Sequence, residues 1–302
     1  MFWTNGGRRI LEATFPDGEK NIWGFTVQGR VSKAPNVDVY AMTQGDTLTW
    51  KWESDADFTT LLLLKNCYPN FEYLRILYLP YSREDRNSQK RSRCPLRYIG
   101  QFIQGLGFER VIVVDPHSDL TMAYLGENAE PIYPGDSLRY AASIESTTTP
   151  AVQEAGAPVV VMFPDAGAQK RYGDAWGRFP QFIGSKVRDF KTGKITGYTV
   201  AGGEIAKDKH VLIVDDLCSY GGTFILAGNA LQTPEYRPSK ITLVVTHCEN
   251  SIFEGKIFRA DSPIDRVVTT DSLIDPQIVR SHQECMILPA VPGRLTVIEL
   301  PK

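Results

Sequence analysis

Short runs of apolar residues recur along the chain, and they have the length of buried β-strands. Segments with the apolar spacing of amphipathic helices lie between several of these runs, at 57–66, 95–106 and 224–231. Alternation of this kind favours parallel sheets covered by helices, which is an α/β architecture. The strands are predicted at residues 37–42, 74–79, 111–115, 159–163, 211–215, 241–246, 266–270 and 295–300.

The predicted strands fall into two groups, separated by a stretch rich in Pro, Gly, Ser and Thr at 133–156. We therefore expect two doubly wound parallel-sheet domains, residues 1–138 and 139–302, with the active site between them. The segment 185–203 has many Lys, Gly and Thr residues and little apolar periodicity. This composition predicts a long exposed loop or a β-flap, the kind of segment that closes over a site.

The composition excludes several classes of protein. Of the 302 residues, 42% are hydrophobic and 23% are charged, which is typical of a globular protein. The formal net charge of −2 gives no general attraction to nucleic acid or to a membrane surface, and no apolar run approaches the roughly 20 residues of a membrane span. The five cysteines are scattered without metal-binding spacing, so we expect a reduced, cytoplasmic protein without structural zinc.

The stretch 211–224 carries the strongest chemical signal. Its four apolar residues predict a buried strand that ends on Asp215 and Asp216, and a Gly-rich turn at 219–223 leads into a helical pattern. Backbone N–H groups at a helix start suit a phosphate, and paired carboxylates suit sugar hydroxyls or a hard cation. These groups together predict a ribose-phosphate site at the carboxyl edge of a sheet. The alternative is an ordinary βα turn with acids at a strand end.

Polar residues also follow three other predicted strands. A basic segment, 81–95, follows the second strand, and its arginines suit a polyphosphate because guanidinium groups pair with phosphate oxygens. The alternative for this segment is a solvated charged loop. His117 follows the third strand, where a lone histidine is more often structural than a ligand. Asp165 follows the fourth strand and is suited to ligating magnesium or orienting a ligand.

Several of these segments together resemble one family. In order and approximate spacing they are similar to the ribose-phosphate pyrophosphokinases, also called PRPP synthetases, whose domains have the type I phosphoribosyltransferase fold. The resemblance extends from about residue 15 to residue 270. The matching motifs are Phe-Pro-Asp-Gly-Glu at 15–19, Tyr-Ser-Arg-Glu-Asp-Arg at 81–86, Arg-X-Arg-Cys-Pro at 91–95, Val-Asp-Pro-His-Ser at 114–118, Pro-Asp-Ala-Gly at 164–167, Lys-Val-Arg at 186–188, Val-Asp-Asp-Leu at 214–217 and Thr-His at 246–247.

The resemblance implies a role for each matching residue. The implied ATP-binding residues are Phe15, Asp17, Glu19, Arg83, Glu84 and Arg86, of which the first three would reach the adenine of a neighbouring subunit. The implied magnesium-binding residues are His117 and Asp165. The implied ribose-phosphate-binding residues are Asp215, Asp216, Ser219, Tyr220, Gly221, Gly222 and Thr223. Lys186 and Arg188, on the mobile loop, would be the catalytic residues that stabilise the transition state.

The resemblance also implies a reaction. The diphosphoryl group of Mg-ATP would pass to the anomeric hydroxyl of ribose 5-phosphate with release of AMP, in a homo-oligomer, either a dimer or a hexamer. Where the family has Asp-Thr-X-Gly-Thr, however, this chain has Ser-Tyr-Gly-Gly-Thr at 219–223. The bulky phenol of Tyr220 leaves two acceptors open: ribose 5-phosphate, and ADP-ribose, as in some PRPP-synthetase-like enzymes of viral NAD-rebuilding pathways.

Two functions of other classes stay open. A phosphoribosyltransferase that consumes PRPP would share the 215–223 loop, but it would not need the motifs at 15–19 and 81–86. A catalytically silent regulatory subunit would share most of the motifs. The presence of Lys186 and Arg188 argues against the silent subunit.

Overall fold

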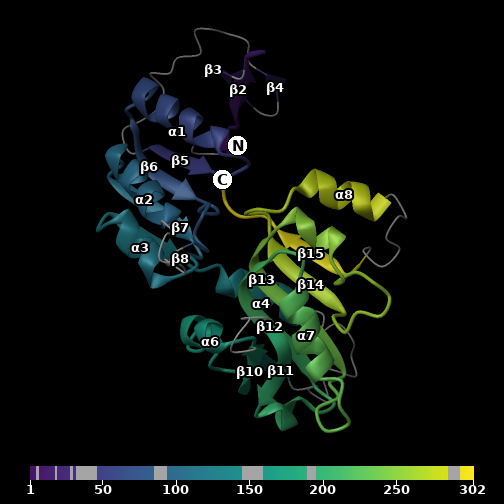
Figure 1. The fold of residues 1–302 in the computed structure, drawn as a ribbon. Coiled ribbons are helices and arrows are strands. Elements are labelled where there is room, and N and C mark those ends of the chain that lie inside the picture. The colour runs from purple at the N-terminus through teal and green to yellow at the C-terminus, as the bar shows by residue number, and fades with distance from the viewer. Residues whose placement is uncertain are drawn as a thin grey trace. The chain divides into compact units, whose positions relative to one another are not determined.

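The computed structural model describes residues 1–4, 7–17, 19–27, 30–31, 46–84, 94–144, 159–188, 195–284 and 293–302. The chain divides into two compact units, Met1–Tyr133 with Leu300–Lys302, and Pro134–Glu299. Each unit has its own, mostly parallel, sheet with helices packed on it (Figure 1). The predicted α/β fold with two parallel sheets is therefore confirmed. The predicted division at 138/139 and the predicted site between the domains stay predictions.

The first unit is built on a sheet with the strand order β1-β5-β6-β7-β8. Strands β5 to β8 pair in parallel, and only β1 runs antiparallel to its neighbour. The strands are β1 (Phe2–Trp3), β5 (Asp46–Trp50), β6 (Phe71–Ile76), β7 (Arg110–Val114) and β8 (Ala129–Ile132). The helices are α1 (Ala56–Cys67), α2 (Pro95–Gly105) and α3 (Asp119–Leu125). A separate antiparallel sheet contains β2 (Ile10–Thr14), β3 (Lys20–Val27) and β4 (Arg30–Val31).

The second unit has a larger sheet with the strand order β11-β10-β9-β12-β13-β14-β15. The strands are β9 (Val159–Phe163), β10 (Gln181–Arg188), β11 (Ile195–Ala201), β12 (His210–Cys218), β13 (Lys240–Cys248), β14 (Arg266–Thr270) and β15 (Leu295–Ile298). The helices are α4 (Gly135–Ile144), α6 (Ala166–Tyr172), α7 (Gly222–Ala230) and α8 (Pro276–Glu284), with short 3-10 helices η2 (Gly203–Ala206) and η3 (Asn250–Glu254). None of the helices in the described ranges is long and apolar enough to span a membrane.

The central strands of this sheet are buried on both faces, which explains their continuous apolar runs. Successive side chains of a strand point to opposite faces. Val211 and Ile213 accordingly pack in one hydrophobic cluster, and Leu212 and Val214 pack in another. Because these strands run parallel, the polar residues that follow each apolar run lie at the same carboxyl edge of the sheet.

The predicted strands agree with the structure except at some ends. β12 continues through Asp215 and Asp216 to Cys218, because its pairing with β13 extends to the partners Cys218 and Cys248. β6 ends at Ile76 rather than at residue 79, because its parallel partner β5 ends at Trp50. The predicted strand at 37–42 lies outside the described residues.

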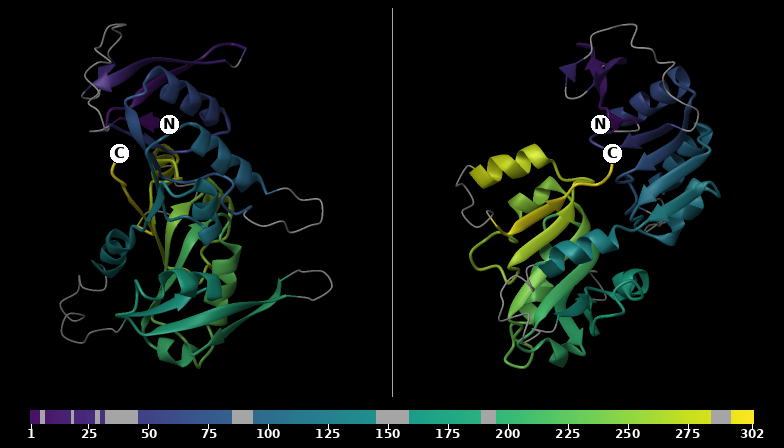
Figure 2. Two further views of the ribbon diagram at one scale, coloured as in Figure 1. Left: turned by 90° about the vertical axis from the view of Figure 1, so that its left-hand side faces the viewer. Right: turned by 180° about the vertical axis from the view of Figure 1, so that it is seen from behind.

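The described parts of the segment 185–203, residues 185–188 and 195–203, agree with a β-flap rather than a loop. β10 and β11 pair as antiparallel neighbours from Ile183 opposite Ala201 to Arg188 opposite Ile195. The two strands extend side by side as a long hairpin, which is clearest in the left view of Figure 2. A second hairpin, β2–β3, projects from the first unit in the same view.

Helix α2 supplies a matched pair of glycines that tests the packing of the first unit. A Cβ atom added at Gly100 would overlap the backbone carbonyl of Tyr124 in α3, whereas nothing lies within 4 Å of a Cβ added at Gly105. We expect Gly100→Ala to lower the free energy of unfolding by about 1–3 kcal/mol through overpacking. Gly105→Ala is expected to be neutral or to stabilise by up to about 1 kcal/mol. Urea unfolding measures both, and equal effects would contradict the close approach of α2 and α3.

Candidate functional site

Three carboxylates gather at the carboxyl edge of the second sheet. Asp215 and Asp216 lie near the end of β12, and Asp165 is the second residue after the end of the neighbouring strand β9. The Asp216 backbone N–H donates to Asp215 Oδ1 at 2.9 Å. Parallel pairing of β9 with β12 is what brings acids 50 positions apart in sequence to one place.

The pKa of the Asp215 carboxyl group is affected by the other negative charges at this edge. Burial raises the pKa of the Asp215 carboxyl well above its ordinary value, and the charges of Asp216 and then Asp165 raise it further. A ligand that brings positive charge or hydrogen-bond donors would stabilise the ionised form of these carboxyl groups. The cluster therefore has the chemistry of a site for a cation or for sugar hydroxyls.

Two basic side chains approach the acids from adjacent elements. Arg171 Nη1, at the end of α6, lies 3.3 Å from Asp216 Oδ2. Lys186 Nζ, on the flap strand β10, lies 3.6 Å from Asp165 Oδ2. Asp165 also caps α6 by accepting hydrogen bonds from the backbone N–H groups of Gly167 and Ala168, each at 3.1 Å. The cap holds the Asp165 carboxylate in place.

The loop between β12 and α7 has the form that the sequence predicts for a phosphate site. Gly221 has a left-handed φ of 78° and precedes the first residue of α7. Its carbonyl accepts hydrogen bonds from the backbone N–H groups of Phe224 and Ile225, both at 3.0 Å. The N–H groups of Gly222 and Thr223 precede the first intrahelical donor, so they point out of the helix start, where an anion binds.

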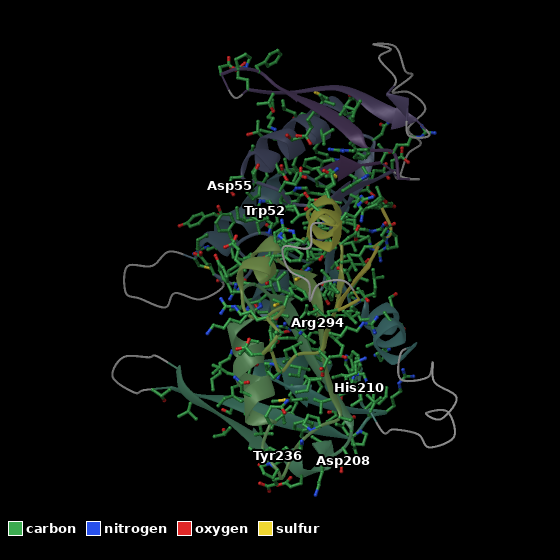
Figure 3. The ribbon with its side chains drawn as sticks, turned by 90° about the vertical axis from the view of Figure 1, so that its right-hand side faces the viewer. Trp52, Asp55, Asp208, His210, Tyr236 and Arg294 are labelled. Atoms are coloured by element: carbon green, nitrogen blue, oxygen red, sulfur yellow. The ribbon has the colours of Figure 1, made fainter. Side chains whose placement is uncertain are left out.

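The segment that follows β13, at Gly255 and Ile257, packs closely against this loop. A Cβ atom at Gly255 would overlap the Tyr220 carbonyl oxygen, and a Cβ atom at Gly221 would overlap Ile257. The supporting segment is in turn held by Arg294, which donates to the carbonyl oxygens of Ile257 at 3.0 Å and Asp265 at 3.0 Å, and also to that of Ile264. Figure 3 labels Arg294. The phosphate loop is thus fixed by backbone contacts, while the Tyr220 side chain is 58% exposed.

The flap contributes a second side chain besides Lys186. Tyr198 on β11 pairs opposite Lys186, and its hydroxyl donates to the Pro164 carbonyl at 2.8 Å. Burial and the charges of Asp165 and Asp215 raise the pKa of Tyr198. Arg188 ends β10, but its side chain lies outside what the structure describes.

The predicted nucleotide-binding residues of the first unit lie on its surface. Phe15, Asp17 and Glu19 form the turn between β2 and β3, where the Phe15 N–H donates to the Glu19 carbonyl at 2.8 Å and the Glu19 N–H to Asp17 Oδ1 at 3.1 Å. Phe15 is 47% exposed. Arg83 and Glu84 are exposed after β6. Arg86 lies outside the described residues.

Backbone strain marks the carboxyl edge of the first sheet. Tyr81 and Asp115 have left-handed φ values of 62° and 44°, which residues other than glycine rarely adopt. The Tyr81 hydroxyl donates to Asp55, with distances of 2.8 and 2.9 Å to the two carboxylate oxygens. Figure 3 labels Asp55 close to Trp52. His117 is half-buried just beyond Asp115.

The predicted metal ligands His117 and Asp165 belong to different units, so the pair stays a prediction. Over the described ranges, no group of three or more His, Cys, Asp or Glu side chains has metal-binding geometry. The raised pKa of Asp215 beside Asp216 and Asp165 nevertheless shows oxygen donors with excess negative charge. Carboxylate oxygens are the type of donor that a hard divalent cation such as magnesium prefers, but the described acids are not arranged as a metal site.

Sequence reasoning missed three residues around the site: Arg171, which pairs with Asp216, Tyr198, which binds the Pro164 carbonyl, and Arg294, which binds carbonyls of the segment after β13. The motifs give Arg171 no role, although a basic residue six positions after Asp165 on the following helix is a usable signal. The contact of Tyr198 could not be predicted, because the sequence of a flap does not indicate which of its side chains contacts the rest of the sheet. Arg294, which braces the phosphate loop from the start of β15, was missed for the same reason.

The two α/β units, the acid pair and the glycine-capped loop define a class: a phosphoribosyltransferase-type fold with a candidate ribose-phosphate site. No protein-family model matches the chain. The ribose-phosphate pyrophosphokinase of Pyrococcus abyssi is 28% identical over 270 residues, which cover 86% of this chain and 82% of that protein. That of Thermococcus kodakarensis is 27% identical over 283 residues, which cover 90% of this chain and 89% of that protein.

A solved structure has the same fold. The phosphoribosylpyrophosphate synthetase of Mycobacterium smegmatis superposes with a TM-score of 0.69 at 18% identity, covering 97% of this chain and 87% of that one. This chain is therefore a homologue of the ribose-phosphate pyrophosphokinases, as its motifs predict. These relatives confirm the prediction of an enzyme, an ATP-dependent diphosphotransferase.

The charge crowding at Asp215 predicts an unusual pH dependence of stability. Because the pKa of Asp215 is raised in the folded state, its contribution to stability falls as the pH rises above the ordinary value of 3.8. We expect Asp215→Asn to raise the melting temperature at pH 7.5 and to lose that advantage toward pH 4. Added Mg²⁺ is expected to stabilise the wild type more than the variant.

Thermal unfolding followed by circular dichroism between pH 4 and 8 measures these changes. The control is Asp261→Asn, which alters an exposed aspartate in the same unit and should leave the melting temperature unchanged. A variant that is less stable than the wild type at pH 7.5 would contradict the crowding.

Proposed function

We propose that this chain transfers the diphosphoryl group of ATP to the anomeric hydroxyl of a ribose 5-phosphate moiety and releases AMP. One observation carries the proposal: the Asp215–Asp216 pair near the end of β12 is followed six residues later by the glycine-capped start of α7, and Lys186 of the flap pairs with Asp165, the third acid of the cluster. The homology to ribose-phosphate pyrophosphokinases supports it.

The acceptor binds along this loop. Its 5-phosphate accepts hydrogen bonds from the backbone N–H groups of Gly222 and Thr223, where the helix dipole also favours negative charge. The hydroxyl groups of Ser219 and Thr223 add donors. The carboxylates of Asp215 and Asp216 accept hydrogen bonds from the ribose hydroxyls, which fixes the sugar and the direction of its anomeric oxygen.

ATP is held by residues of the first unit. Arg83 and Arg86 pair with phosphate oxygens, and Glu84 accepts a hydrogen bond from the nucleotide. The exposed turn with Phe15, Asp17 and Glu19 is available to a second copy of the chain, whose adenine it would contact in a homo-oligomer. His117 in the first unit and Asp165 in the second are the proposed ligands of magnesium, which would neutralise phosphate charge.

The transfer step needs charge stabilisation more than covalent chemistry. A bond forms between the anomeric oxygen and the β-phosphorus while the bond from that phosphorus to the oxygen bridging to the α-phosphorus breaks, and AMP leaves with the bridging oxygen. Lys186 and Arg188 place positive charge on the transferred group. The flap that carries them excludes water and so limits hydrolysis of ATP.

The open space beside Tyr220 and Gly222 favours a second candidate acceptor for the same reaction, ADP-ribose. Its product would be ADP-ribose pyrophosphate, for NAD synthesis. The Tyr220 side chain is 58% exposed, while the backbone of Tyr220 packs against Gly255. A Cβ atom at Gly222 would meet nothing within 4 Å, so there is open space at the helix start. A second phosphate and an adenosine that stacks on Tyr220 could extend into that space.

Product analysis tests the function and the acceptor together. We expect AMP and a diphosphorylated acceptor, detected by mass spectrometry, when the protein is supplied with Mg²⁺, ATP and either ribose 5-phosphate or ADP-ribose. If Tyr220 stacks on the larger acceptor, Tyr220→Thr should lower kcat/KM for ADP-ribose about 5- to 100-fold and leave that for ribose 5-phosphate nearly unchanged. Equal effects on both acceptors would contradict a role of Tyr220 in selecting between them, and no AMP with either would overturn the function.

Lys186 tests the role of the flap in the transfer step. We expect Lys186→Ala to lower kcat about 10²- to 10³-fold, as for loss of one group that stabilises transition-state charge. The affinity for ATP, measured by calorimetry, should change less than threefold. Lys207→Ala, which removes an exposed lysine elsewhere in the second unit, is the matched control and should retain full activity. A Lys186→Ala protein with normal kcat would remove this residue from the mechanism.

A further inference from the structure

The flap is attached to the rest of its unit by a contact that the sequence motifs do not include. The hydroxyl of Tyr198, on β11, donates to the backbone carbonyl of Pro164 at 2.8 Å. Pro164 directly precedes Asp165, so the contact joins the flap to the loop that carries one of the three clustered acids. The bond spans 34 residues of sequence, which makes it a tertiary contact rather than part of the hairpin.

The backbone around Tyr198 is arranged to let its ring reach this carbonyl. The ring lies across Gly184 of β10, where an added Cβ atom would overlap the Tyr198 hydroxyl and ring. Any side chain at this position would therefore push the phenol off Pro164. The ring also packs against the hydrophobic cluster under the sheet, so Tyr198 is half-buried and its direction is fixed.

Lys186 and Tyr198 act on the same loop from adjacent strands. They are directly opposed in the antiparallel pairing, which puts both side chains on one face of the hairpin. Tyr198 binds the Pro164 carbonyl, and Lys186 Nζ lies 3.6 Å from Asp165 Oδ2. Burial and the charges of Asp165 and Asp215 raise the pKa of Tyr198, so its hydroxyl stays protonated and remains a donor at neutral pH.

We propose that Tyr198 is a positioning residue for the transfer reaction, which holds the flap at the Pro164 carbonyl and thereby sets where the Lys186 ammonium group stands relative to Asp165. The kinetic part of this inference rests on the proposed function; the anchoring part does not. Tyr198 acts through Lys186 and does not itself contact the transferred group.

Tyr198→Phe tests the inference, because it keeps the ring and removes only the donor. We expect kcat to fall about three- to tenfold, the effect of one hydrogen bond, with KM for ATP and for the acceptor changed less than twofold. In a Lys186→Ala background the same substitution should have no further effect on kcat. Independent, multiplicative effects of the two substitutions would overturn the proposal.

Thr199→Val is the matched control. Thr199 is exposed on the same strand, and its hydroxyl donates within the hairpin to the Ser185 carbonyl at 3.4 Å. If only the integrity of the hairpin mattered, this variant would lose as much activity as Tyr198→Phe. We expect it to retain wild-type kcat, and a loss equal to that of Tyr198→Phe would contradict the specific role of Tyr198.

A second measurement reads the position of Lys186 without any turnover. Competitive acetylation by a trace of acetic anhydride, read by mass spectrometry, reports how freely each lysine reacts. We expect Lys186 to react at least twofold faster in Tyr198→Phe than in the wild type, with no change in Thr199→Val. An unchanged rate would overturn the anchor even if the enzyme is active. A raised rate in a protein that forms no AMP would support the anchor while the proposed function fails.

Discussion

Crowding of negative charge at the carboxyl edge of the second sheet is the constraint on which the candidate site depends. Parallel pairing of β9 and β12 brings Asp165 beside Asp215 and Asp216, and burial together with the charges of Asp216 and Asp165 raises the pKa of Asp215. Carboxylates this close are unfavourable for folding unless a ligand or a basic side chain compensates them. Arg171 and Lys186 supply part of that compensation, and a bound cation with its substrate would supply the rest.

The loop beside these acids is rigid for backbone reasons. Gly221 adopts a conformation that other residues avoid, Gly255 leaves room for the Tyr220 carbonyl, and Arg294 holds the supporting segment through its carbonyl oxygens. A loop fixed in this way presents its N–H groups to a phosphate without rearrangement. Tyr220 is the one large side chain of the 219–223 segment, and in the proposed function it would select the acceptor.

The flap contrasts with this rigid loop. It is a two-stranded arm that extends from the sheet, and among the described residues its ties to the acid edge include the Lys186–Asp165 pair and the Tyr198–Pro164 hydrogen bond. Both ties converge on two consecutive residues. The flap thus reaches the acid edge through side chains, whereas β10 is joined to the sheet through its backbone pairing with β9.

The sequence by itself determined the α/β class, five strands of the second unit, the acid pair and the family resemblance, because each depends on local apolar runs and on motifs that are contiguous in the chain. It did not predict β10, and it left the segment of β11 open between a loop and a flap, since these strands lack a continuous apolar run. It misplaced the end of β12, since pairing with β13 rather than composition decides where a strand stops. Only the tertiary structure showed that Arg171 meets Asp216, that Arg294 braces the phosphate loop, and that Tyr198 reaches Pro164. These contacts join elements distant in sequence, and the direction of a side chain across such a distance is set by packing, which no local pattern records.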